Sequence, residues 1–158
     1  MAYLAALPIS GPAIRIIIFN LILLVSCGYA LRKGGPPEWI GAAIFIVAAL
    51  LTALLVSPMA LRFHRVEHGL LAVDVAVLAG FFILSLISER YWPLWMTSLQ
   101  IIEVGTHLTR LIAPHLIPRA YSEAVTFWGY PMLILLGIAT WRHQNRLKTS
   151  GADKSWKR

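Results

Sequence analysis

The stretch that decides the fold is IGAAIFIVAALLTALLVSPMAL, residues 40–61, which runs for 22 positions without a charged side chain. A helix rises about 1.5 Å per residue, so this stretch is long enough to cross the roughly 30 Å hydrocarbon core of a bilayer. Pro58, near its end, removes one backbone hydrogen bond, a loss that helices in membranes tolerate. The sequence therefore predicts a membrane-spanning helix here.

The rest of the chain shares this apolar character. Of its 158 residues, 58% are hydrophobic and 13% are charged, and the mean hydropathy is +0.71. A soluble domain is about 45–50% apolar and about 25% charged, and one domain of this length could not bury so much apolar surface in a water-soluble core. The single cysteine, Cys27, excludes an internal disulfide and a metal site built from cysteines. We expect a polytopic membrane protein, and the composition excludes nearly every class of soluble enzyme.

Proline, glycine and charged residues divide the chain into further apolar runs. Three of them have the length and composition of spanning helices, at residues 13–31, 70–87 and 121–141. Tyr121 and Trp141 lie at the two ends of the last run, where aromatic rings meet the membrane interface.

The stretch at residues 94–112 is more polar, and its polar side chains gather on one side of the predicted helix. At about 100° per residue, four of them fall within an arc of about 80°: Gln100, Glu103, His107 and Arg110. Such a helix either spans the membrane with its polar stripe turned into a bundle, or lies at the surface. The predicted fold class is all-α, a single bundle over residues 1–141 with five transmembrane helices. Four spans plus one amphipathic or re-entrant helix are the alternative.

Basic residues concentrate at the carboxyl end. Six of the fourteen lysines and arginines lie in the last seventeen residues: Arg142, Arg146, Lys148, Lys154, Lys157 and Arg158. With five spans, the positive-inside rule predicts an inside carboxyl terminus and an outside amino terminus. We expect residues 142–158 to form a disordered cytoplasmic tail that attracts anionic lipid, in a plasma membrane or a bacterial inner membrane. We expect no nucleic-acid partner, because a basic tail directly after a span is first a topology signal.

Ionisable side chains inside a span are candidates for function, because each costs about 2.5–3.5 kcal/mol at mid-membrane. If residues 70–87 and 94–112 form an antiparallel hairpin, Asp74 lies level with about residue 108, beside His107 and Arg110, with Glu103 one turn deeper. Six residues are our candidates to bind a ligand, a proton or an ion: Asp74, Gln100, Glu103, His107, Arg110 and Glu123. The alternative is that these groups only neutralise one another and fix the packing of the helices.

A separate motif, His64-x-x-Glu67-His68, puts two imidazoles at i, i+4 on one helical face with a carboxylate beside them. This is the spacing of inverzincin metalloproteases, in which the histidines hold zinc and the glutamate activates water. Glu103 or His107 would supply a third ligand. The pattern is short and lies in a predicted membrane loop, so a chance match is common. We expect no bound cofactor; a metal at this motif, or haem or pigment at His107, is the alternative.

The sequence contains no complete catalytic constellation, and no motif matches a known family residue by residue. We therefore expect a non-enzymatic membrane component: a subunit, an assembly factor or a small transport or ligand-binding protein. Its polar helix face would contact a second copy of the chain, a larger membrane complex or a small polar ligand. The alternative is a membrane-embedded metal-dependent enzyme that uses His64, Glu67 and His68.

Overall fold

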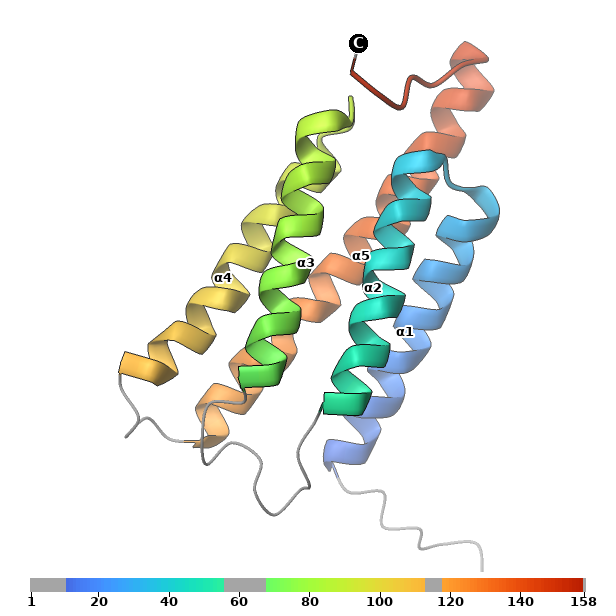
Figure 1. Cartoon of the computed structure of the whole chain (residues 1–158). Helices are drawn as coiled ribbons and strands as arrows, with labels where there is room; N and C mark the ends of the chain where they lie inside the picture. Colours follow the sequence, from blue (N-terminus) through green and yellow to red (C-terminus); the bar gives the residue numbers. More distant parts are fainter. Residues whose placement is uncertain (1–10, 56–67, 113–117, 158) are drawn as a thin grey trace, which may run out of the picture.

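The computed structural model of the chain describes residues 11–55, 68–112 and 118–157, and these form five helices and a short returning tail (Figure 1). The side chains are described over residues 14–55, 69–109 and 127–157. In chain order the helices are α1 (Gly11–Lys33), α2 (Pro36–Leu55), α3 (His68–Ile87), α4 (Trp92–Ile112) and α5 (Pro118–Ser150). The predicted all-α class is confirmed.

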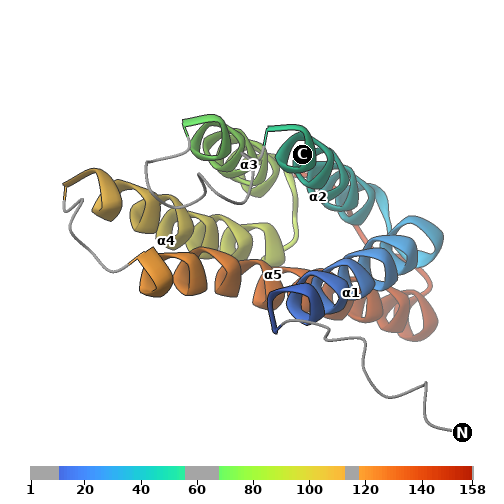
Figure 2. The ribbon, with the colours of Figure 1, turned by 90° about the horizontal axis from the view of Figure 1, so that it is seen from below.

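The helices run up and down in turn and close into a ring. Each packs against its neighbours in the chain, and α1 also packs against α5. Seen from below, α2 and α3 lie in one row and α4, α5 and α1 in the other (Figure 2). The turn between α1 and α2, the turn between α3 and α4, and the carboxyl terminus all lie at the same end of the bundle (Figure 1). We call this the C-terminal end.

Apolar side chains cover the outside of the bundle. Three helical segments are long and apolar enough to cross a membrane: Ile14–Lys33, Pro36–Leu55 and Gly69–Ile87. Large side chains on these helices point outward, and Leu54 is 81% exposed. Such a surface is costly in water and favourable in lipid, which agrees with a membrane protein. Helices α4 and α5 carry more polar residues and are not clearly apolar enough by the same measure.

Aromatic rings form the centre of the core near the C-terminal end. The ring centroids of Phe45 and Phe81 are 5.2 Å apart, and those of Phe81 and Trp92 are 6.3 Å apart. Gly41 allows this packing, because a Cβ atom there would lie 2.6 Å from Trp92 Cη2. The rings therefore fix α2, α3 and the start of α4 against one another.

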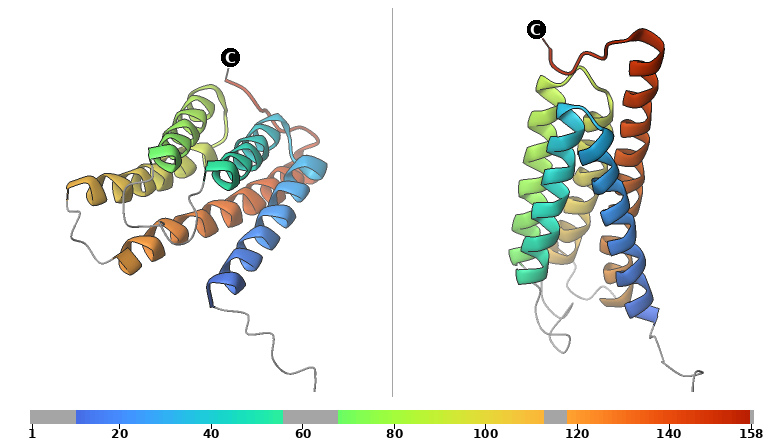
Figure 3. Two further views of the ribbon diagram at one scale, coloured as in Figure 1. Left: turned by 60° about the horizontal axis from the view of Figure 1, so that its bottom comes forward. Right: turned by 90° about the vertical axis from the view of Figure 1, so that its right-hand side faces the viewer.

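The carboxyl end differs from the predicted disordered tail over residues 142–158. Helix α5 continues through Pro131 and past Trp141 to Ser150. Residues 151–157 then turn back at Gly151 and pair with the end of α3 in an antiparallel bridge between Ser88 and Trp156. The tail crosses the C-terminal end of the bundle (Figure 3, right). Contacts with other elements order these residues. The prediction of a disordered tail considered only the local sequence, which does not show such contacts.

Candidate functional site

The polar stripe of α4 points into the bundle. Gln100, Glu103 and His107 are each less than a tenth exposed, whereas Trp95, Ile101 and Leu108 on the opposite side are about half exposed or more. A spacing of three and four residues places the polar group on one face, and that face packs against α3 and α5. The described part of α4 therefore has its polar face inward and its apolar face outward.

Asp74 of α3 meets this stripe. The Oδ2 atom of Asp74 lies 2.8 Å from Nε2 of His107, within ion-pair distance. Gln100 Nε2 donates a hydrogen bond to the backbone oxygen of Asp74 at 3.3 Å, and its buried Oε1 has no hydrogen-bond partner among the described residues. Glu103 lies one turn from His107 and close enough to interact electrostatically with Asp74. We call Asp74, Gln100, Glu103 and His107 the inner site; the predicted level of Asp74 beside His107 is confirmed.

The inner site lies in the second half of α4, and buried side chains close it toward the start of that helix. The side chain of Asp74 is 19% exposed and that of His107 only 2%. From Gln100 toward the start of α4, the next inward residues are Met96, fully buried, and Thr97, whose hydroxyl donates to the backbone oxygen of Pro93. No ionisable residue occurs between Trp92 and Glu103 in the sequence. This interval is about 16 Å along the helix axis, so the ionisable groups of α4 do not continue along this helix toward the C-terminal end.

Several predicted residues lie outside what the structure describes. The motif residues His64 and Glu67 fall outside the described residues, and so do the side chains of His68, Arg110 and Glu123. Within the described ranges, no three histidine, cysteine, aspartate or glutamate side chains are placed to hold a metal ion. Among the described side chains, the polar stripe of α4 therefore contacts one of the predicted residues of other helices, Asp74.

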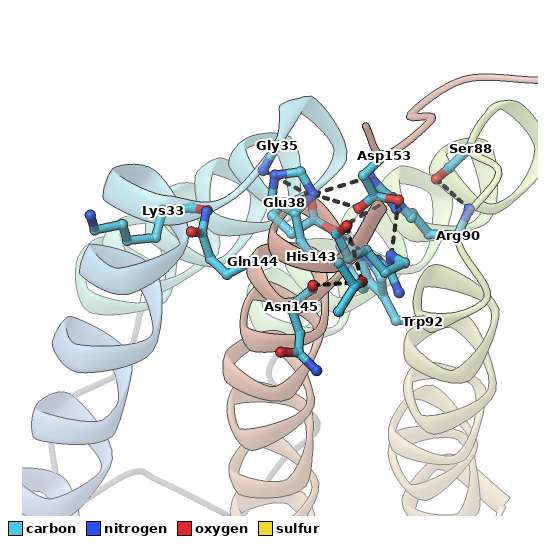
Figure 4. A network of polar contacts seen from close by, with 12 residues as sticks. Lys33, Gly35, Glu38, Ser88, Arg90, Trp92, His143, Gln144, Asn145 and Asp153 are labelled. Carbon is cyan, nitrogen blue, oxygen red and sulfur yellow. Dashed lines mark hydrogen bonds and ion pairs between the residues drawn. The ribbon is translucent and has the colours of Figure 1, made fainter. Parts of the chain in front are cut away.

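A second polar cluster, which the sequence did not lead us to predict, lies at the C-terminal end (Figure 4). We call its members the end cluster: Glu38, Arg90, His143, Arg146 and Asp153. They come from the start of α2, the turn between α3 and α4, the last third of α5 and the tail. Four of the five side chains are less than a tenth exposed, and Arg146 is 39% exposed.

Glu38 anchors the inner part of the end cluster. Its Oε2 accepts a hydrogen bond from the backbone N–H of Gly35 at 3.0 Å, three residues back, as the glutamate of a capping box does. Its Oε1 accepts one from Trp92 Nε1 at 3.0 Å and lies 3.9 Å from Arg90 Nε. A glycine at position 35 allows His143 of α5 to lie close to this turn, because a Cβ atom there would lie 2.9 Å from Cε1 of His143.

Asp153 of the tail receives three donors at once. His143 Nδ1 lies 2.6 Å from its Oδ2 and donates a hydrogen bond to it in the tautomer that carries the hydrogen on Nδ1. Arg146 Nε donates to Oδ1 at 2.9 Å, and Arg90 Nη1 donates to the same oxygen. Burial alone would raise the pKa of Asp153, but these three hydrogen bonds and the charge of Arg90 outweigh it and hold the pKa below its usual value.

The sequence did contain a signal for the end cluster. A five-helix, up-and-down topology places the loop at residues 34–35, the loop at residues 88–91 and the tail on one side. Glu38 and Arg90 are among the charged residues in or near those loops, so the topology alone brings them to one end. Which carboxylate each cation meets depends on contacts between residues far apart in the chain, such as the 63-residue separation of Arg90 and Asp153.

Comparison with protein-family models, with curated proteins and with solved structures finds no match to this chain. The two polar sites and their positions in the bundle are therefore the features that bear on function.

Proposed function

We propose that the protein is a non-enzymatic integral membrane component, a subunit, assembly factor or small transport or ligand-binding protein, with five spanning helices. The inward polar stripe and outward apolar face of α4 support a fifth span over a surface helix. The basic residues of both short turns and of the tail lie at the C-terminal end, which supports a cytoplasmic position for that end. The membrane would be a plasma membrane or a bacterial inner membrane.

Within this component, the inner site binds a proton. The observation that carries the proposal is the contact of 2.8 Å between Asp74 Oδ2 and His107 Nε2. A carboxylate and an imidazole at this distance exchange or share a proton, and the second carboxylate, Glu103, lies one turn away on α4. Two carboxyl groups and one imidazole this close to one another form a coupled site that can hold a proton between them.

Closure of the site toward the C-terminal end supports a binding site rather than a continuous path. Asp74 is the most exposed member of the inner site and lies near the start of α3. Through Asp74 the site is open toward the membrane face opposite the C-terminal end. Protonation from that face changes the charge between α3 and α4 and hence their packing. The protein would sense or store a proton and pass the change to a partner: a second copy or a larger membrane complex.

The test is pH-difference infrared spectroscopy of the full chain in lipid vesicles, which reports carboxyl groups as they gain and lose protons. We expect pH-dependent carboxyl bands in the native chain that change in Asp74→Asn and in Glu103→Gln. Glu89→Gln is the matched control, because Glu89 is exposed in the turn between α3 and α4. It should leave those bands unchanged.

Two results would overturn this assignment. One is a native spectrum whose pH-dependent bands are lost only in Glu89→Gln. The other is a set of spectra that stay the same in Asp74→Asn, Glu103→Gln and His107→Gln, with each variant shown to be folded by circular dichroism.

A further inference from the structure

The end cluster has the composition of an anion site that is already filled. Three donors from two separate elements converge on the Asp153 carboxylate: the guanidinium of Arg90 in the turn after α3, and His143 and Arg146 of α5. The Arg90 side chain is 5% exposed, and its Nε, 3.9 Å from Glu38, makes no hydrogen bond within the part of the chain that the structure describes. Guanidinium groups in such an arrangement recognise carboxylate and phosphate oxygens.

We propose that Arg90, His143 and Arg146 form a phosphate-binding site, and that the tail places Asp153 in it as an internal substitute ligand. The phosphate comes either from the headgroup of an anionic lipid or from inorganic phosphate. Both have enough acceptor oxygens for the three donors that Asp153 now satisfies. The site is separate from the inner site and does not depend on its proton.

The charges that remain after Asp153 leaves favour an anion. Arg90 and Arg146 carry two positive charges, and Glu38 is the one acid of the end cluster that stays. Both Glu38 oxygens already accept hydrogen bonds, from Gly35 and Trp92. The vacated position therefore has a net positive charge with donors directed at it.

The tail is attached lightly enough to exchange. Besides Asp153, it is held by backbone hydrogen bonds from Glu89 N to Ser155 O at 3.2 Å and from Lys157 N to Ile87 O at 2.9 Å. Lys157 Nζ adds one bond to the backbone oxygen of Ser85. The side chains of Ala152, Lys154 and Lys157 are exposed and Trp156 is 39% exposed, so Trp156 is the large apolar side chain that release would uncover further. Gly151, with φ of 67°, is the point at which the tail turns away from α5.

The experiment compares the full native chain with Asp153→Asn, which keeps the shape of the side chain and removes its charge. Isothermal titration with inorganic phosphate, in a detergent without phosphate groups, should give Asp153→Asn at least a tenfold lower Kd than the native chain. Adding Arg146→Gln to this variant should raise the Kd about tenfold again, since one charge-assisted bond is lost. Arg142→Gln is the matched control on the exposed side of the same helix and should change nothing.

A second measurement separates the two sources of phosphate and works in the native chain. Hydrogen–deuterium exchange of the peptide spanning residues 151–158 is followed in micelles that contain phosphatidylcholine, in the same micelles with phosphatidylglycerol, and in both with inorganic phosphate. Faster exchange with inorganic phosphate assigns the site to the free ion. Faster exchange with phosphatidylglycerol alone assigns it to a lipid headgroup, because phosphatidylcholine carries a phosphate without net negative charge.

The proposal is overturned if Asp153→Asn binds inorganic phosphate no more tightly than the native chain does, and if neither phosphatidylglycerol nor inorganic phosphate speeds the exchange of residues 151–158 in the native chain. If Asp153→Asn does not fold, the exchange measurement on the native chain decides. Exchange of residues 151–158 that neither phosphatidylglycerol nor inorganic phosphate alters would then show that Asp153 is only a structural contact.

Discussion

Glu38 is a fully buried carboxylate at the first turn of a helix, where an acidic residue is usually exposed. It accepts two hydrogen bonds and faces Arg90, so removing it leaves a buried guanidinium with one counterion fewer. We predict that Glu38→Ala lowers the free energy of unfolding by about 3–5 kcal/mol. Thermal unfolding in detergent measures this. Glu89→Ala, an exposed acid nearby, should stay within about 0.5 kcal/mol of the native chain, and equal losses in the two variants would contradict the role of Glu38.

Asp153 makes stability depend on acid. Its pKa lies below the usual value in the folded chain, so the ionised form stabilises the fold. This contribution is fully present above about pH 4, the ordinary range of an aspartate, and is lost as the pH falls through the lowered pKa. We predict that the native chain has a higher Tm than Asp153→Asn at pH 7, and that the difference shrinks toward pH 3. A difference that grows on acidification would contradict the assignment.

At the scale of residues, the sequence predicted one of the two sites. Asp74 is an isolated charge in an apolar run, so the cost of burying it indicated a partner. Counting residues in an antiparallel hairpin pointed to His107 and Arg110; the contact with His107 is present, and the side chain of Arg110 lies outside the described residues. Glu38 gave no such indication, because a glutamate three residues after a glycine at a helix start is ordinary on a surface. Its burial comes from Trp92 and Arg90, more than fifty residues later.

At the scale of elements, the contact between α2 and the start of α4 depends on Gly41. A methyl group there would lie 2.6 Å from Trp92 Cη2, and Trp92 cannot move aside freely because its Nε1 is bonded to Glu38. We predict that Gly41→Ala destabilises the chain by about 1–3 kcal/mol, measured by thermal unfolding. Gly28→Ala is the control, because no atom lies within 4 Å of its added Cβ. Its Tm should match or exceed that of the native chain, and a larger loss there than at Gly41 would contradict this packing.

The helices themselves were largely predictable, and the end of α5 was not. Apolar runs bounded by proline, glycine and charge gave all five helices to within a few residues at most ends. Past Trp141 the sequence becomes polar and basic, which by itself is also typical of a solvated tail. The helix persists because its residues have partners elsewhere: Gln144 donates to the backbone oxygen of Lys33, and His143 and Arg146 bond to Asp153.

At the scale of the whole molecule, the proposed topology of five spans would place both short turns and the tail on the cytoplasmic side. We test this with single cysteines in a Cys27→Ser background, one at exposed Glu89 and one at exposed Ser150. We predict that an impermeant maleimide labels neither Glu89→Cys nor Ser150→Cys in intact cells and labels both in inverted vesicles. Cys27→Ser alone should not react in either. Labelling of one position but not the other in intact cells would contradict the five-span topology.

The most direct test of the proposed proton site is nitrogen NMR of labelled histidines in the full chain, recorded across pH in lipid vesicles. The native chain should show one imidazole whose signals titrate together with a carboxyl group and disappear in His107→Gln. Asp74→Asn should change the pH dependence of that imidazole, whereas Glu89→Gln should leave it as it is in the native chain. A His107 imidazole that titrates identically in the native chain and in folded Asp74→Asn would contradict the proposal that the two residues bind a proton together.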